Sequence, residues 1–207
     1  MARKGLTQEK IIDEAIYLIK ERGYKEFSMR TLAEHLDVKP ASMYNHFKSL
    51  EDVVIAVGLK IYERFNAVQE EAINNARTRK EAVMALALAY RQFAFENPEL
   101  YKVIRVLPKL GGEQLTEIVQ EWIKPMKQVM SLYHIDNEKQ MHWQRIYRAT
   151  ITGFLSNEIS GQFVWNPVSP EESYRLAIMN IIAALESMER EEKTRAAFLN
   201  SVLDEKE

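Results

Sequence analysis

The sequence predicts an all-α protein of about nine helices, with a small three-helix domain over residues 1–48 and a larger helical bundle over residues 49–207. Three observations support this fold class. Apolar residues recur at the three- and four-residue spacing that places them on one face of a helix. Gly, Pro and helix-capping residues separate these segments. The sequence also has no persistent period-two alternation, so no β-strand is expected.

Composition and charge exclude several classes of protein. The 207 residues include no Cys, so disulfides and thiolate chemistry are unavailable, which fits a reducing cytoplasm. The sequence lacks an apolar run of about 18 residues or more, as a membrane span needs, and lacks the apolar region of a signal peptide. The net charge is −2, but residues 1–48 hold nine Lys/Arg and seven Asp/Glu. The N-terminal domain is therefore the better candidate for facing nucleic-acid phosphates.

The first helix is expected to begin at Thr7, whose hydroxyl can cap it, and to end at Arg22. Gly23 can terminate it, because glycine readily adopts the left-handed conformation common after a helix. Its apolar stripe consists of Ile11, Ile12, Ala15, Ile16, Leu18 and Ile19. Tyr24 and Phe27 in the following connection are expected to fill the small core.

Two short helices joined by a tight turn follow, over residues 28–48. Ser28 can cap the first, and Pro40 suits the first turn of the second, where no backbone N–H is needed. Met43 and Phe47 lie four residues apart, so both can pack under the preceding helix. The opposite face then carries hydrogen-bonding side chains, as reading the DNA major groove requires. A plain solvated hairpin is the alternative for this stretch alone.

A long fourth helix is expected from Ser49, which can cap it, to about Asn75. The fifth helix, from about Thr78 to the break before Pro98, is apolar on most sides and should be central to the bundle. The sixth is expected to end at Val106.

A loop is predicted at Pro108 and the Gly pair that follows it. The seventh helix should then run from about Glu113 to Tyr133, with Pro125 bending it.

Asp136 or Asn137 can cap an eighth helix, which should reach about Ser160 and end at Gly161. Pro170 then begins a ninth helix that reaches about Met188. From Glu189 the charged tail is predicted either to add one or two helical turns or to fray.

The stretch from Ala33 to Lys48 resembles the DNA-binding motif of TetR-family repressors, with Tyr44, His46 and Phe47 in place. The residues that follow resemble the start of the family's long linking helix, and the number and order of helices are similar throughout. The resemblance implies a homodimeric transcription repressor that binds a double-stranded DNA operator and is released by a small-molecule effector.

Four side chains suit direct reading of bases. The Asn45 amide can bond adenine bidentately, Lys39 can bond guanine, Ser42 is short and versatile, and Arg30 can reach a base or a phosphate. The resemblance assigns contacts to the DNA backbone to Tyr44, His46 and Lys48. The complete set of candidate DNA-binding residues is Arg30, Lys39, Pro40, Ala41, Ser42, Tyr44, Asn45, His46 and Lys48.

Two further segments, residues 96–101 and 150–154, resemble the effector domain of one TetR subgroup, which is named for a Trp and a His-Gly pair. Arg148 and Thr152 stand where that subgroup has the Trp and the His. No ligand of the subgroup is therefore transferred to this chain.

Aromatic and Met side chains of the larger bundle predict a pocket for a small hydrophobic effector, because such pockets are mostly apolar with few polar groups. The candidates are Tyr90, Phe93, Tyr101, Trp122, Met126, Trp143, Tyr147 and Phe154. Arg148, Thr150 and Thr152 are candidate polar contacts. For each aromatic residue, a solid core is the alternative.

The last two long helices carry more apolar surface than one fold needs, which predicts a four-helix interface between two chains. The candidate interface residues are Ile151, Leu155, Ile178, Ile181, Ile182 and Leu185. The alternative is that they only close the core of a single chain.

Signals for catalysis and metal binding are missing from the sequence. His134 and His142 have no Glu or Asp three residues before them, as a Glu-x-x-His site in a bundle would need. Phosphate-binding loops and nucleophile elbows are also absent from the sequence. No enzyme activity, cofactor or metal is therefore expected, and the alternative class is a helical enzyme or adaptor with an incidental helix-turn-helix.

Overall fold

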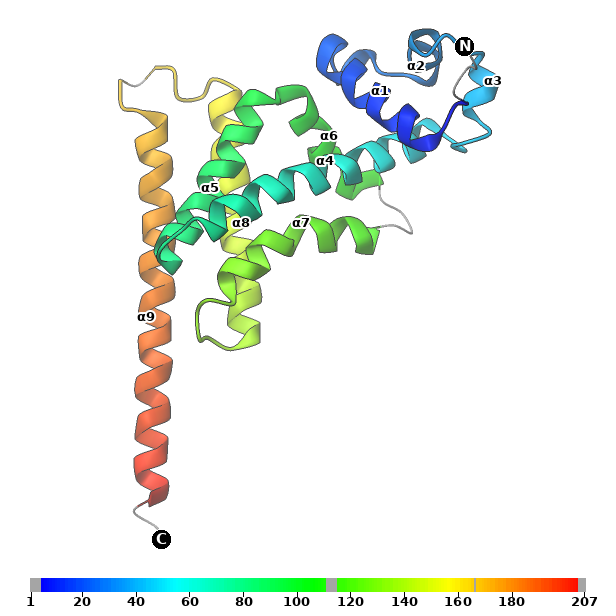
Figure 1. Ribbon diagram of the computed structural model, residues 1–207. Coiled ribbons are helices and arrows are strands. Elements are labelled where there is room, and N and C mark those ends of the chain that lie inside the picture. Colours follow the sequence, from blue (N-terminus) through cyan, green and yellow to red (C-terminus); the bar gives the residue numbers. More distant parts are fainter. Residues whose placement is uncertain (1–4, 111–114, 166, 205–207) are drawn as a thin grey trace. The chain divides into compact units, whose positions relative to one another are not determined.

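The computed structural model describes residues 5–110, 115–165 and 167–204 (Figure 1). The elements in chain order are α1 (Gln8–Arg22), the 3-10 turn η1 (Tyr24–Glu26), α2 (Met29–His35), α3 (Pro40–Met43), α4 (Leu50–Asn74), α5 (Arg79–Glu96), α6 (Pro98–Leu110), α7 (Leu115–Met130), α8 (Asn137–Ile159) and α9 (Pro170–Asp204). The prediction of an all-α fold with nine helices is confirmed for these residues. Among them, no helix combines the length and apolar character that crossing a membrane requires.

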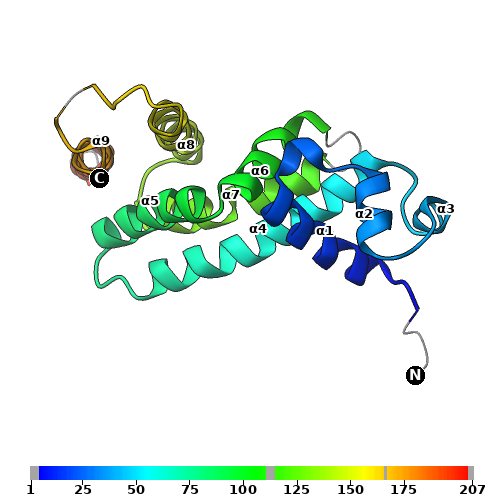
Figure 2. The same ribbon diagram turned by 90° about the horizontal axis from the view of Figure 1, so that it is seen from above.

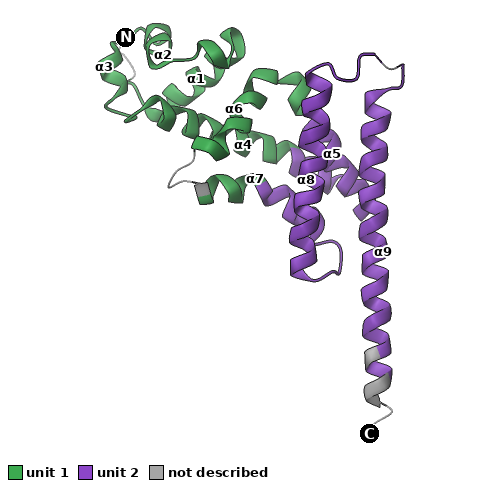
Figure 3. Ribbon diagram, turned by 180° about the vertical axis from the view of Figure 1, so that it is seen from behind, with its two compact units in different colours: residues 1–68, 92–122 green, residues 69–91, 123–207 purple. Residues whose placement is uncertain are grey.

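The chain divides into two compact units, coloured separately in Figure 3. Unit 1 consists of residues 1–68 and 92–122, and unit 2 of residues 69–91 and 123–207. The helices α4, α5 and α7 each contribute to both units. The predicted boundary at residue 48 stays a prediction, because the structure groups the three-helix motif with most of α4 and with α6.

The start and end of α1 lie where the capping signals predicted them. The Thr7 hydroxyl accepts a hydrogen bond from the Lys10 N–H at 3.2 Å, and Gly23 has a φ of +87° just after the helix. The stripe on α1 is buried apart from Ile12, which is half-buried. Phe27 is buried beside it as predicted, while Tyr24 is half-buried.

The helix α6 is held close to both α1 and α4 within unit 1. The Tyr24 N–H at the end of α1 donates to Glu99 Oε2 at 2.9 Å. Hydrogen bonds from Lys102 and from the Tyr24 N–H lower the pKa of the Glu99 carboxyl. Gly58 on α4 lies so near Leu107 on α6 that an added Cβ would fall 2.1 Å from the Leu107 Cδ1. Glycine is therefore required at this crossing for steric reasons.

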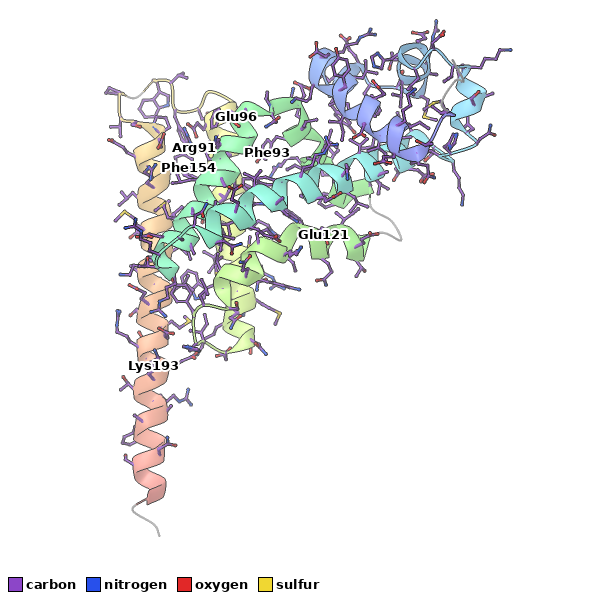
Figure 4. The ribbon with its side chains drawn as sticks, viewed as in Figure 1. Arg91, Phe93, Glu96, Glu121, Phe154 and Lys193 are labelled. Carbon is purple, nitrogen blue, oxygen red and sulfur yellow. The ribbon has the colours of Figure 1, made fainter. Side chains whose placement is uncertain are left out.

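Two prolines lie inside helices, and α4 satisfies the carbonyl that each of them leaves without its usual donor. Pro108 has no N–H to offer Ile104 O, and the Tyr62 hydroxyl donates to that oxygen instead at 3.1 Å. Pro125 likewise has no N–H for the Glu121 carbonyl, and the side-chain amide of Asn66 on α4 donates to that oxygen at 2.9 Å. Figure 4 labels Glu121 on the part of α7 that runs alongside α4.

Unit 2 is built on α5, with α8 and α9 bonded to its backbone. The Tyr147 hydroxyl of α8 donates to Val83 O at 2.7 Å, and the Tyr174 hydroxyl of α9 donates to Ala87 O at 2.8 Å. Both tyrosines are fully buried. An ion pair between Arg91 and Glu158, at 2.5 Å, adds a further tie between α5 and α8. The two carbonyls lie one helical turn apart on α5, so the hydroxyls fix both outer helices against the same face.

Four element ends differ from the predictions, and one of them is the end of α7, at Met130 rather than about Tyr133. The helix α3 ends at Met43 and continues as a turn rather than reaching Phe47. The helix α6 runs past Pro108 to Leu110 instead of ending at Val106, because Tyr62 replaces the missing donor.

The helix α9 is unbroken to Asp204, so the predicted alternative of a frayed tail is wrong for the described residues. Charged residues of both signs and good helix formers follow Glu189, so local propensity and charge pairs favour continuation of the helix. The expected start of α7 at Glu113 lies outside the described residues, and the expected bend at Pro125 stays a prediction.

Candidate nucleic-acid interface

The first helix of the motif, α2, begins with a reciprocal cap. The Ser28 hydroxyl accepts from the Thr31 N–H at 3.1 Å, and the Thr31 hydroxyl accepts from the Ser28 N–H at 3.0 Å. The predicted cap at Ser28 is confirmed, whereas the role of Thr31 was missed. The Ser-x-x-Thr spacing is a weak form of the capping box and could have indicated it.

The turn between the two helices depends on Asp37, which has a φ of +54°. Asp is among the few residues other than glycine that enter this left-handed region readily. The Val38 N–H then bonds Ala33 O at 3.0 Å and closes the turn against α2.

The second helix, α3, is fixed to unit 1 by its buried side. Met43 is fully buried and Phe47 is 9% exposed, as the four-residue spacing predicted. Backbone bonds from His46 and Phe47 to Met43 O, at 3.0 and 3.1 Å, hold the turn that follows the helix. This packing orients the opposite side of residues 39–48 toward solvent.

The solvent-facing side holds most of the predicted DNA-binding residues. Lys39, Pro40, Ala41, Tyr44, Asn45 and Lys48 are exposed, and Ser42 and His46 are half-buried. Tyr44 is 56% exposed, which is unusual for so large a ring on a folded surface. An amide, an ammonium and a hydroxyl on one short helix can bond base edges in a major groove.

Arg30 is engaged within its own helix. Its Nε donates to Glu34 Oε1 at 2.8 Å, and both side chains are mostly exposed. Such an exposed pair is weak, so the guanidinium can exchange this carboxylate for a phosphate at little cost.

Three contacts that the sequence does not signal position the motif on α1. The Gln8 side-chain amide donates to His46 O at 2.8 Å, which fixes the residues after α3. His35 of α2 bonds Glu14 of α1 at 2.9 Å and stacks on the Tyr17 ring at 5.5 Å. Figure 2 shows α2 beside α1, and α3 on the other side of α2.

The predicted effector residues are distributed over both units. Phe93, Tyr101 and Trp122 belong to unit 1, and the others belong to unit 2. In unit 1, Phe93 stacks on Phe65 with ring centroids 4.2 Å apart.

In unit 2 the contacts favour a packed core. Burial raises the pKa of Tyr147, whose hydroxyl bonds Val83, and the Trp143 N–H points to the Met188 sulfur at 3.3 Å. Phe154, labelled in Figure 4, packs on Tyr174 with centroids 5.2 Å apart. Tyr90 and Met126 are buried. The hydroxyls of Thr150 and Thr152 bond carbonyls of their own helix. The effector pocket therefore stays a prediction.

The predicted interface residues Ile151, Leu155, Ile178, Ile181, Ile182 and Leu185 are all buried within the single chain. This burial agrees with the alternative, in which they close the chain's own core, and the interface at these residues stays a prediction. Other apolar side chains on these two helices are exposed, among them Met141, Ile146 and Ile159 on α8 and Leu176, Met179 and Phe198 on α9.

Among the described residues, no three His, Asp or Glu side chains come close enough together to hold a metal ion. His142 Nε2 lies 3.9 Å from the carboxylate of Glu138, four residues before it, on the surface.

Fold and site together define a DNA-binding transcription regulator of the helix-turn-helix class. Comparisons with known proteins agree. A model of the bacterial regulatory proteins of the tetR family matches residues 11–57, and a model of the tetracyclin repressor-like C-terminal domain matches residues 83–181. The chain belongs to the TetR family of transcriptional regulators.

Individual relatives fit this assignment. An uncharacterized HTH-type transcriptional regulator of Mycobacterium tuberculosis is 26% identical over 183 residues, which cover 87% of this chain and 82% of the relative. The fatty acid metabolism regulator protein of Bacillus subtilis is 31% identical over 124 residues, which cover 60% and 64%.

Among solved structures, the fatty acid degradation regulator FadR from Bacillus halodurans has a TM-score of 0.64 at 16% identity, covering 86% of this chain and 96% of that one. At this identity the similarity shows the fold. The family is one of regulators rather than enzymes.

Proposed function

We propose that the protein is a cytoplasmic, homodimeric repressor that binds an inverted-repeat operator and is released from it by a small hydrophobic ligand. The observation that carries the proposal is the division of residues 39–48 into a buried side, Met43 and Phe47, and an exposed side of hydrogen-bonding groups. A helix that is anchored underneath and polar outside suits insertion into a major groove.

The DNA contact proposed for each residue follows from the chemistry of its side chain. Asn45 bonds adenine, Lys39 bonds guanine, and Ser42 adapts to either partner. The apolar surfaces of Pro40 and Ala41 suit a thymine methyl group. Tyr44, His46, Lys48 and Arg30 fix the motif on the phosphates, which set register without reading sequence.

Dimerisation is proposed through the exposed side of α8 and α9. Leu176 and Met179 on α9 are 61% and 58% exposed, and Ile146 on α8 is 45% exposed. At Gly153, also on α8, an added Cβ would meet no atom within 4 Å. An exposed apolar face with a glycine on it allows two helices to approach closely, and a two-fold axis would then pair two motifs with two half-sites.

The ligand class is supported by composition and by relatives. Eight aromatic or Met candidates lie in the described helices, and two similar proteins are named for fatty acid metabolism and fatty acid degradation. Both features favour a ligand with an aliphatic or otherwise apolar body. Release requires that the ligand bind the DNA-incompetent conformation more tightly, because equal affinity for both would shift nothing.

A gel-shift experiment with the DNA upstream of the protein's own gene tests the regulator directly. We expect a sequence-specific complex that contains two chains per site and survives an excess of unrelated DNA. Binding that unrelated DNA removes completely at low salt would contradict specific operator recognition. Two competitors of equal length, with the inverted repeat intact or with one half-site scrambled, distinguish dimeric from single-motif recognition.

A further inference from the structure

A groove of about 250 Å³ lies within unit 1, between α1, α4 and the corner where α5 meets α6. Its lining includes Lys20, Arg64, Phe65, Val68 and Phe93. Its position matters because α1 supports the DNA-binding motif of α2 and α3, whereas α4 follows that motif in the chain. Figure 4 labels Phe93 on the α5 side of this groove.

The floor of the groove is apolar and partly open. Phe65 and Phe93 stack at 4.2 Å and give it a rigid aromatic base. Val68 is 55% exposed, so an apolar side chain stands at the edge with incomplete cover. The volume lies just below the range of about 300–1,000 Å³ that is usual for small-molecule sites, which suits a small, slender ligand.

The rim is cationic, and no carboxylate lines the groove. Lys20 is exposed and forms no ion pair within the described part of the chain. Arg64 forms one hydrogen-bonded pair, from its Nη2 to Asp13 Oδ1 on α1 at 2.6 Å. A ligand with an apolar body and one negative charge would match both features.

A second groove, in unit 2, provides the contrast. It has about 380 Å³ and is lined by Met84, Met179, Ile182 and Ala183, with Lys80, Glu81 and Glu186. Its cation, Lys80, is already paired with Glu186 at 2.9 Å. Two carboxylates against one paired ammonium make this groove a poor site for an anion.

We propose that the groove between α1, α4 and α6 binds a small aliphatic carboxylate and that this binding weakens operator affinity. The hydrocarbon part of the ligand would cover Val68, Phe65 and Phe93. Its carboxylate would pair with Lys20 and compete with Asp13 for Arg64. Displacement of Asp13 breaks the Arg64–Asp13 ion pair between α4 and α1. Its loss changes how firmly the DNA-binding motif is held. The proposed loss of operator affinity rests on the proposed function, whereas binding of the carboxylate to the groove does not.

Isothermal titration calorimetry of the full chain with decanoate tests the site. We expect saturable binding to one site per chain. Lys20→Gln should weaken it about fivefold, as for a partly exposed ion pair. Val68→Trp should reduce it at least tenfold by filling the edge of the groove. Lys80→Gln, in the second groove, is the matched control and should leave the affinity unchanged. The neutral alcohol 1-decanol should bind more weakly than decanoate.

Either of two results would overturn the site: affinity for decanoate that does not change with Lys20→Gln and Val68→Trp, or equal affinity for decanol. For the regulatory half, decanoate should lower operator affinity in the wild type and fail to do so in Val68→Trp. If decanoate binds at this site and operator affinity does not change, the proposed effect on DNA binding is overturned. Operator binding without decanoate is measured separately, so failure of the groove proposal remains distinct from failure of the proposed function.

Discussion

Asn45 and Lys48 lie three residues apart on the exposed side of the motif, but their side chains suit different parts of DNA. An amide bonds a base edge, whereas an ammonium neutralises a phosphate. Asn45→Ala is therefore expected to cost about 1–3 kcal/mol at one base pair and to relax specificity there. Lys48→Ala should weaken all sequences alike and lower the slope of log affinity against log salt by about 0.9.

Fluorescence anisotropy with the operator and with single-base variants, at several salt concentrations, separates these effects. Lys193→Ala on α9 controls for the loss of a charge outside the motif. If both motif variants bind every sequence as the wild type does, the recognition surface has been misassigned.

Glu189 on α9 is a nearly buried carboxylate at the centre of a charge cluster in unit 2. It accepts from the His134 N–H at 2.9 Å and pairs with Arg79 at 2.7 Å. The bond from the His134 backbone and that from Arg79 lower its pKa from 4.5 to about 2. A carboxyl whose pKa is lowered by folding stabilises the protein above its unfolded pKa, and this contribution is lost as the pH falls toward the folded value.

Glu189→Gln should thus lower the free energy of unfolding by about 1–3 kcal/mol near neutral pH, as for loss of hydrogen bonds to a buried charge. The difference from wild type should shrink as the pH falls from 4.5 toward 2. Urea unfolding of both proteins at a series of pH values measures this difference in the free energy of unfolding. Exposed Glu138→Gln is the control, and a difference independent of pH would show that the charge of Glu189 is not the cause.

At the scale of elements, α4 carries the donors that allow α6 and α7 to contain proline. Tyr62 and Asn66 lie one turn apart on α4 and bond Ile104 O and Glu121 O, the carbonyls opposite Pro108 and Pro125. A buried carbonyl without a donor costs about 1–3 kcal/mol. The long helix α4 is therefore attached to α6 and α7 through hydrogen bonds from its side chains to their backbone carbonyls.

A double-mutant cycle tests this compensation. Tyr62→Phe should destabilise the protein by about 1–3 kcal/mol, because Ile104 O loses its donor. In a Pro108→Ala background the restored N–H can serve that carbonyl, so the same change should cost clearly less. Thermal and denaturant unfolding of the four proteins gives the coupling energy. Equal costs in both backgrounds would mean that Tyr62 contributes through packing alone.

At the scale of the whole molecule, the assembly depends on which apolar residues remain exposed. Leu176→Glu with Met179→Glu changes two exposed side chains and should produce a folded monomer with weak operator binding. Changing the fully buried Ile178 or Leu185 instead would disrupt the chain's own core. Sedimentation velocity gives the oligomeric state, and circular dichroism confirms folding.

Lys60→Glu serves as the surface control for the added negative charge. A dimer that persists at micromolar concentration in the double variant would place the interface elsewhere on the chain.

The sequence by itself determined the helices and the motif, because their signals are local. Thr7, Ser28 and Asp136 cap the helices where predicted, since a side-chain oxygen needs only a backbone N–H three residues away. Gly23 and Gly161 have positive φ just after helices, as glycine permits. The burial of Met43 beneath the recognition surface also follows from spacing within one turn.

Only the tertiary structure decided what each apolar face is packed against. Amphipathic spacing shows that Ile178 is buried but not whether its own chain or a second chain buries it, and here its own chain does so. The tertiary structure also decided that α6 continues past Pro108, because the compensating donor, Tyr62, lies on another helix. Pairings such as Tyr24 with Glu99 join residues distant in the chain. Their geometry depends on how whole helices pack, which no local pattern encodes.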